Sequence, residues 1–192
     1  LNAALNAFVA KKQFELAYAT WLSSLSPERS DIVDLLNNGS FETDPSGAPF
    51  DWNIRGGVEA KAKIGSISGH GSRALHIEFG HGRAVFPNVY EYIMLVPGYY
   101  HFQAEYKGDL VARRGLQWLV SCADSRRAGE SEMILGLTYR WRKIQFEFSI
   151  PEKGCETQRV SLIHNARSPS EQIISGSAWF DNLSIVRADT DN

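Results

Sequence analysis

The stretch Ala178-Trp179-Phe180-Asp181-Asn182-Leu183 near the end of the chain decides the fold, together with Asn38-Gly39-Ser40-Phe41-Glu42 near the start. Each stretch carries one carboxylate beside a bulky aromatic residue. The sequence between them consists of short runs of alternating polarity, the pattern of β-strands with one buried face. We therefore expect the two stretches to form the first and last strands of one closed β-domain, with their carboxylates placed to share a cation.

Alternating polarity recurs throughout the region between these two stretches. In residues 99–107, apolar and aromatic residues alternate with His101, Gln103, Glu105 and Lys107. The same two-residue period recurs in residues 58–64, 75–79, 116–122, 144–150, 160–164 and 183–185. Turn signals such as Pro97-Gly98 separate the runs. About eight to ten short strands without an intervening helix predict an all-β, antiparallel jelly-roll β-sandwich and exclude a doubly wound α/β fold.

The first thirty residues have a different pattern and are expected to form a short N-terminal α-helical appendage. Residues 1–25 contain no Gly or Pro, their apolar residues fall near helical spacing, and Pro27 marks the stop. The polar stretch 26–34 is typical of a linker. We expect a helical segment at 1–30 and a β-sandwich domain at 37–187.

Residues 12–25 resemble the turn and second helix of a tetratricopeptide repeat. The match lies in the positions that such repeats pack between neighbouring helices, here Phe14, Ala17, Trp21 and Leu25. Lys12 stands where the family has glycine, and a lone repeat cannot bury its own apolar face. The resemblance implies that the helix packs on its own sandwich or on further repeats upstream, and that it offers a surface to a protein partner. An ordinary amphipathic helix explains the same pattern.

Composition excludes several function classes. The chain has 192 residues, 43% hydrophobic and 22% charged, as in ordinary globular domains. A formal charge of -2 and the absence of a long Lys/Arg run argue against a nucleic-acid partner. No apolar run approaches the length needed to span a bilayer. Because the chain opens at Leu1, we expect a fragment or processed product of a longer exported protein.

Two cysteines, Cys122 and Cys155, are the internal clue to compartment. Cys122 ends a strand-like run, and Cys155 follows the turn 151–154, so both lie where strands finish. A disulfide between them would stabilise the fold by roughly 3 to 4 kcal/mol. Two buried free thiols are the alternative. The disulfide is the favoured interpretation, and it predicts an extracytoplasmic location, periplasmic or secreted.

Five segments give a more specific resemblance over residues 37–187. In order, they are 38–42, Pro49-Phe50-Asp51-Trp52, Gly71-Ser72-Arg73-Ala74-Leu75-His76-Ile77, Val96-Pro97-Gly98-Tyr99-Tyr100-His101-Phe102 and 179–182. Each segment is weak alone, but their order and spacing resemble a jelly-roll carbohydrate-binding module of the galactose-binding-like superfamily, of the type that binds xylan and glucan chains. The resemblance implies non-catalytic binding of a polysaccharide or oligosaccharide, and it does not name the sugar.

The same resemblance implies a structural calcium ion that joins the first and last strands. The ligands would be side-chain oxygens of Glu42 and Asp181, with backbone carbonyls from the first strand and the loop around Ser72-Arg73. Calcium takes six to eight oxygen ligands and accepts carbonyls as well as carboxylates. The alternative is that Glu42 and Asp181 are solvated or bonded to Arg73, whose guanidinium could replace the ion.

Sugar binding needs flat apolar faces bordered by planar polar groups. If Tyr100 and its even-numbered neighbours are core, His101, Gln103 and Glu105 form a polar stripe on an outer sheet face. By the same alternation Trp141 points outward, and it is the favoured aromatic platform, ahead of Trp179.

The remaining candidates lie outside this stripe. Trp52 occupies a loop-like stretch and is equally suited to ligand contact or to packing over the sandwich edge. Trp118 shares parity with Leu116 and Val120, which predicts a core position. Arg114, in an expected loop, could bind a charged sugar.

Catalytic motifs are missing from the sequence, and an enzyme is not expected. A glycoside hydrolase would need a facing carboxylate pair such as Glu105 and Glu147. A polysaccharide lyase would need groups such as His101, Gln103 and Tyr139. Both are weaker interpretations than binding. The stronger alternative is a structural or protein-interaction domain that uses the N-terminal helix.

Overall fold

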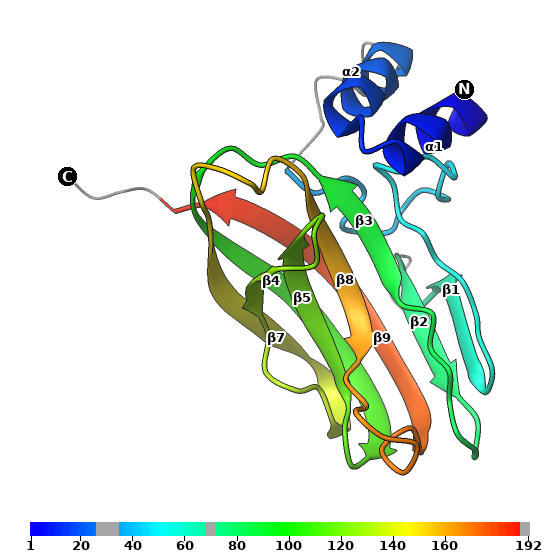
Figure 1. Cartoon of the computed structure of the whole chain (residues 1–192). Helices are drawn as coiled ribbons and strands as arrows, with labels where there is room; N and C mark the ends of the chain where they lie inside the picture. Colours follow the sequence, from blue (N-terminus) through cyan, green and yellow to red (C-terminus); the bar gives the residue numbers. More distant parts are fainter. Residues whose placement is uncertain (26–34, 68–71, 189–192) are drawn as a thin grey trace.

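The computed structural model describes residues 1–25, 35–67 and 72–188, which form a β-sandwich with two short N-terminal helices (Figure 1). Every strand pair in these ranges is antiparallel. The five-stranded sheet has the order β1 (Ala60–Ser66), β2 (Arg73–Phe79), β9 (Ile174–Arg187), β4 (Gly98–Ala112) and β7 (Gly136–Ile150). The four-stranded sheet has the order β3 (Val89–Ile93), β8 (Gln158–His164), β5 (Leu116–Cys122) and β6 (Arg127–Glu130). The predicted sandwich is confirmed.

The core lies between the two sheets and is rich in aromatic rings. Trp118 of β5 is fully buried, as its parity predicted. Its ring centroid lies 5.6 Å from that of Phe102 on β4 and 5.5 Å from that of Phe180 on β9. Alternate residues of opposing strands therefore interdigitate, which is the packing that the two-residue period dictates.

The first and last stretches meet, but the first is not a strand as expected, because residues 37–40 form a turn and the first strand of the sheet is β1. The Leu183 N–H donates to the Gly39 carbonyl at 2.9 Å. A Cβ at Gly39 would lie 2.0 Å from the Leu183 carbonyl oxygen, so this approach requires glycine. Trp52 donates its Nε1–H to the Asn38 carbonyl at 3.2 Å and ties the closure to the core.

The N-terminal appendage is a helical hairpin of α1 (Asn2–Ala10) and α2 (Phe14–Ser24). The chain turns at Lys12, whose φ of 59° is left-handed. Leu5 and Trp21 are buried against Phe50 of the sandwich domain. The hairpin therefore packs on its own sandwich, one of the two arrangements expected. The predicted linker, 26–34, lies outside the described residues.

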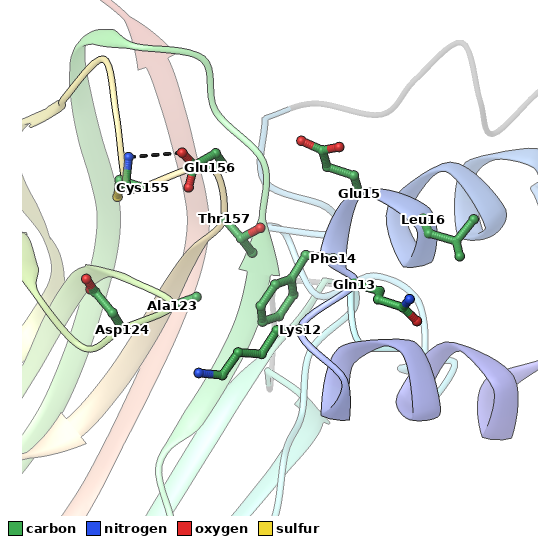
Figure 2. Close-up of a pocket in the computed structure, with 11 residues that line it drawn as sticks. Lys12, Gln13, Phe14, Glu15, Leu16, Ala123, Asp124, Cys155, Glu156 and Thr157 are labelled. Atoms are coloured by element: carbon green, nitrogen blue, oxygen red, sulfur yellow. Dashed lines mark hydrogen bonds between the residues drawn. The ribbon is translucent and has the colours of Figure 1, made fainter.

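A cleft of about 590 Å³ separates the hairpin from one end of the sandwich. Figure 2 shows Lys12 and Phe14 on the helical side and Asp124 and Glu156 on the sandwich side. The Phe14 ring also packs on Tyr92 of β3, with the centroids 5.5 Å apart. The helices thus cover part of the four-stranded side of the molecule.

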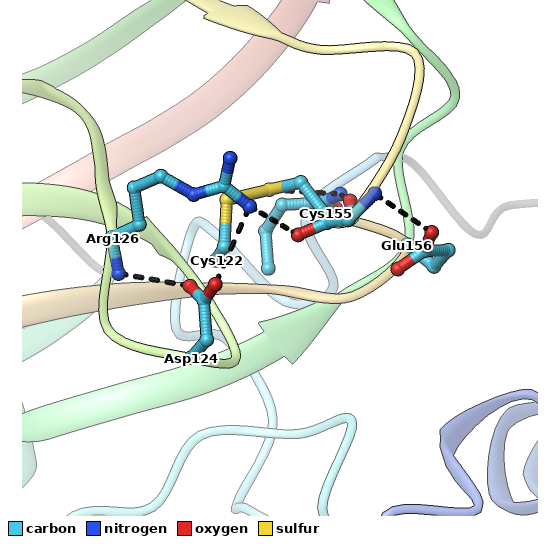
Figure 3. A network of polar contacts seen from close by, with 7 residues as sticks. Cys122, Asp124, Arg126, Cys155 and Glu156 are labelled. Carbon is cyan, nitrogen blue, oxygen red and sulfur yellow. Dashed lines mark hydrogen bonds and ion pairs between the residues drawn. A yellow bond between two sulfur atoms is a disulfide. The ribbon is translucent and has the colours of Figure 1, made fainter.

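Cys122 and Cys155 form a disulfide at this end of the sandwich (Figure 3). Their Cα atoms are 5.0 Å apart, and 33 positions separate them in the sequence. Around the bridge, Arg126 donates to the Asp124 carboxylate and to the Gly154 carbonyl. The expected disulfide is confirmed, and it joins the end of β5 to the turn before β8.

A buried carboxylate lies where the sandwich meets the N-terminal segment. Glu91 of β3 is 2% exposed, and its Oε1 accepts the Asn37 N–H at 3.0 Å. Within the described residues, its Oε2 has no hydrogen-bond partner. Burial raises the pKa of Glu91 well above its usual range, and the nearby Asp51 carboxylate adds to the rise.

Candidate ligand-binding face

The outer face of the five-stranded sheet carries an aromatic pair that spans two strands. His76 of β2 lies directly opposite Trp179 of β9 in the strand register. Their rings are stacked, with centroids 3.9 Å apart and planes 12° apart. Ala178 and Phe180 on either side of Trp179 are fully buried, so Trp179 points away from the core. The pair forms a half-exposed aromatic surface on a face that carries polar side chains and also exposed apolar ones, among them Tyr99 and Val111 of β4.

The indole of Trp179 reaches across β2 to the edge strand. A Cβ placed on Gly65 of β1 would lie 3.5 Å from the indole Cη2 atom, an ordinary contact distance. Partial burial lowers the pKa of the His76 imidazole, with a smaller lowering from Lys63 and an opposing effect of Glu78. These effects favour the neutral form of the stacked imidazole.

Lysines flank the aromatic pair on both sides. Lys63 of β1 lies opposite His76, and Lys107 of β4 lies opposite Trp179. Four neighbouring strands thus contribute one cross-strand row, Lys63, His76, Trp179 and Lys107, which we call the Trp179 row. The acidic groups nearby have other partners. Lys61 Nζ lies 3.0 Å from Glu78 Oε1, and Asp109 Oδ1 accepts the Ser177 N–H at 2.6 Å.

The predicted polar stripe of β4 lies on the same face. His101 Nδ1 lies 3.6 Å from Glu147 Oε1 of β7. Gln103 donates to the Ser184 hydroxyl at 2.8 Å, and the Glu105 carboxylate accepts from the Asn182 amide at 2.9 Å. The outward direction of these side chains follows the alternation of the strand, and the hydrogen bonds fix the orientations of Gln103 and Glu105.

A groove of about 590 Å³ opens beside this stripe. Its walls come from the first stretch, residues 36–43, and from residues 182–186 of β9, with Gln103 also in its lining. The strand pairing shifts by one residue between Gln103 and Glu105, and Asn182 has a left-handed φ of 51°. This β-bulge in β9 sets Asn182 beside Glu105 at the groove.

The fold is similar to that of solved carbohydrate-binding modules. A CBM4 structure superposes with a TM-score of 0.58 and 15% identity over 80% of this chain and 99% of that chain. A family 16 carbohydrate-binding module gives a TM-score of 0.53, with 18% identity over 80% of this chain and 100% of that one. A CBM61 module in complex with β-1,4-galactotriose gives 0.51, with 15% identity over 81% and 99%.

Sequence comparison adds no family beyond this structural likeness. No sequence-family model matches the chain, and no curated protein matches it. Neither helix in the described ranges is long and apolar enough to cross a bilayer.

The structure corrects the prediction that Trp52 contacts a carbohydrate. Its side chain is 1% exposed, and it packs against Phe41 and Trp118 in the core. A loop-like stretch has no strand parity, so the sequence could not distinguish this position from an exposed one. The hydrogen bond to Asn38 gives Trp52 a structural role, and the prediction that it contacts a ligand is wrong.

Arg114 lies apart from the aromatic pair, whereas Trp141 lies near Lys107, two strands from Trp179. Arg114 donates its Nε–H to the Asn165 carbonyl at 3.1 Å, and its own carbonyl lies 2.9 Å from His164 Nε2. It therefore ties the β4–β5 connection to the end of β8. Trp141 is half-buried on β7, where the pairing with β4 is irregular beyond Tyr106.

The expected carboxylates at the closure have different surroundings. Glu42 is exposed, and its Oε1 accepts the Arg73 N–H at 3.1 Å. Asp181 is buried, and its Oδ1 accepts the Asn182 N–H at 2.7 Å. The Arg73 guanidinium binds the Glu42 carbonyl and the Asp44 carboxylate. Across the described ranges, no three His, Cys, Asp or Glu side chains form a group that could hold a metal ion.

The side chains named for the two weaker enzyme interpretations do not come together in the described structure. Glu105 pairs in register with Lys143, and Glu147 pairs with His101. The two glutamates are therefore offset by four residues, or about 13 Å along the strands, at about 3.3 Å per residue. Glycosidase carboxyl pairs are about 5 to 9.5 Å apart. Tyr139 lies near Gly108, far along β4 from His101.

The residue that sequence reasoning undervalued is Trp179. Its signal was present, since it alternates with Ala178 and Phe180 as an outward residue does. The sequence alone does not give the register that sets Trp179 opposite His76, because strand order and pairing depend on the whole fold. Knowledge of the β2–β9 pairing would have placed two rings together on one face.

Proposed function

We propose that the chain is a non-catalytic carbohydrate-binding domain that holds its ligand on the outer face of the five-stranded sheet. The observation that carries the proposal is the His76–Trp179 stack, half-exposed near the centre of the outer sheet face. Stacking uses one face of each ring, so the pair keeps ring surface for the C–H face of a sugar.

Oriented polar groups provide the second requirement for sugar recognition. Gln103, Glu105 and Asn182 carry planar amide or carboxylate groups, and hydrogen bonds already hold them in place. Such groups can satisfy neighbouring hydroxyls with little loss of side-chain freedom. The likeness to carbohydrate-binding modules supports the same conclusion as analogy of fold.

The location that we propose is extracytoplasmic, within a larger exported protein. The Cys122–Cys155 disulfide supports it, because structural disulfides persist in oxidising compartments.

The calcium ion expected at the strand closure is a further part of the proposal. Glu42 and Asp181 supply the carboxylates, and calcium would link the first stretch to β9 there. Arg73 offers a competing explanation, because its N–H and guanidinium already bind the carboxylate and carbonyl of Glu42. Calcium added to chelator-treated protein is expected to raise the Tm. An unchanged Tm at saturating calcium would overturn the calcium site.

A glycan array followed by affinity measurements on variants tests the binding proposal. Trp179→Ala is expected to weaken binding by about fivefold or more, since an aromatic–sugar contact is worth on the order of 1 kcal/mol or above. Trp141→Ala tests the predicted second platform, and unchanged retention would remove Trp141 from the site. Circular dichroism checks the fold of both variants. Silence of the wild-type chain across the array would refute carbohydrate binding and favour the protein-interaction alternative.

A further inference from the structure

We propose that the ligand of this face is an acidic glycan, a polysaccharide whose sugars carry carboxylate or sulfate groups. The juxtaposition behind this inference is the Trp179 row, in which a lysine stands on each side of the stacked aromatic pair. The inference rests on the proposed function for the sugar platform, and it adds the charge of the ligand.

The strand register fixes this arrangement. The residues of the Trp179 row occupy directly opposed positions on four neighbouring strands, in the order Lys63 on β1, His76 on β2, Trp179 on β9 and Lys107 on β4. Neighbouring strands lie about 4.8 Å apart, so the row spans roughly 14 Å between the two outer Cα atoms. A sugar on the aromatic pair would therefore have an ammonium group within side-chain reach on either side.

The two lysines keep their charge available. In the part of the chain that the structure describes, neither Lys63 nor Lys107 forms an ion pair. The nearby acidic groups each have another hydrogen-bond partner, although Glu78 also interacts electrostatically with Lys63. Glu78 pairs with Lys61, Asp109 accepts from the Ser177 N–H and hydroxyl, and Glu105 accepts from Asn182.

The Trp179 row holds two lysines and no carboxylate, although Glu78, Glu105 and Asp109 lie on the same face. A neutral glycan would offer these ammonium groups only hydroxyl and ring oxygens as hydrogen-bond acceptors. An anionic group on the glycan would gain charge-assisted hydrogen bonds from them, which are about twice as strong as neutral ones.

Matched pairs of polysaccharides test the charge of the ligand directly. Polygalacturonate is compared with its methyl ester, and dextran sulfate with dextran, because each pair differs only in charge. The two pairs separate carboxylate from sulfate recognition. Affinity electrophoresis or calorimetry with the full chain, at low and at high salt, provides the readout. We expect tighter binding to one charged member than to its neutral partner, with an affinity that falls as salt rises.

Lysine variants connect that preference to the Trp179 row. Lys63→Gln and Lys107→Gln are each expected to weaken binding of the charged polymer by about fivefold to tenfold. Lys153→Gln makes the same change in net charge and serves as the control. Lys153 lies in the turn after β7, at the Gly98 end of β4, nine positions along that strand from Lys107. It should leave affinity within about twofold of wild type.

Each outcome has a definite meaning. Equal affinity for charged and neutral members would overturn the acidic ligand and leave carbohydrate binding intact. Equal losses in all three lysine variants would overturn the role of the row, since net charge alone would then explain them. Failure to bind any of the four polymers, together with silence on an array of neutral and acidic glycans, would overturn the proposed function itself. Binding of oligothymidylate as tight as that of the acidic glycan would replace the glycan by a nucleic acid.

Discussion

The two outer faces of the sandwich differ in how completely they are covered. On the four-stranded side, all seven residues of β5 are buried, although alternate residues point outward. On the five-stranded side, β4 alternates between buried and exposed or half-exposed positions along its length up to Lys107. Antiparallel sheets commonly leave one face to solvent. The difference teaches that covered outward residues on one side serve folding, while outward residues on the other are free to bind.

The covering of the four-stranded side comes from local contacts and from the hairpin. Gln117 donates to the Ser131 carbonyl at 2.6 Å, which holds the segment after β6 against β5. Phe14 of α2 packs on Tyr92, whose ring lies 5.7 Å from that of Tyr90, and Arg159 lies over the Tyr90 ring. Substitutions on this side should therefore change stability, whereas those on the open face should change binding.

The largest expected effect comes from removing the disulfide at the covered end. Replacing Cys122 and Cys155 by serine should lower the free energy of unfolding by about 3 to 4 kcal/mol, because the unfolded chain regains the entropy of a closed loop of this length. Denaturant titration of the oxidised wild type and the double variant measures the loss. A change below about 1 kcal/mol would show that the covered end gains little from the bridge.

The next effect concerns the buried carboxylate beside the hairpin. The folded-state pKa of Glu91 is raised above its unfolded value. Protonated Glu91 contributes fully to the free energy of unfolding at pH values below the ordinary pKa of glutamate. This contribution is lost as the pH rises through the folded-state pKa. Glu91→Gln should remove this loss and raise the free energy of unfolding at pH 8 by on the order of 1 to 3 kcal/mol.

A carboxylate on the open face supplies the matched control for Glu91. The hydrogen bond and charge of Lys61 lower the pKa of Glu78, so its linkage has the opposite sign. Glu78→Gln should not give the increase at pH 8. Denaturation curves between pH 4 and 9 separate the two variants, and parallel curves for Glu91→Gln and wild type would contradict the assignment.

A smaller effect should distinguish two buried tryptophans. Trp52→Phe loses the hydrogen bond to Asn38 as well as volume. Among the described residues, the Nε1 atom of Trp118 has no partner, so Trp118→Phe loses volume only. Trp52→Phe should therefore be more destabilising by about 1 kcal/mol. Equal unfolding free energies for the two variants would show that the closure does not depend on this bond.

The smallest effect on stability should come from the open face. Trp179→Ala removes a half-exposed ring and should change the free energy of unfolding by about 1 kcal/mol or less, while binding weakens as predicted above. A loss near that of a core tryptophan, about 3 to 5 kcal/mol, would mean that Trp179 belongs to the core and would remove the contrast between the faces.

The sequence predicted those features that depend on local pattern. Alternation around Tyr100 and Phe102 placed the strands and the outward stripe, and spacing placed the helices and the disulfide. Features that depend on long-range strand pairing could not be predicted from the sequence. Nothing local to Trp52 indicated burial, because the ring is buried by Phe41 and Trp118, which come from distant parts of the chain. The Trp179 row likewise exists only after four strands have been aligned.

The position of β1 at the edge of the five-stranded sheet gives its lysines a consequence for solubility. An edge strand offers unpaired backbone groups to other chains, and charged side chains on it discourage such pairing. Lys61 and Lys63 stand on this edge, at alternate exposed positions. A change that neutralised both would therefore be expected to promote edge-to-edge aggregation at high protein concentration.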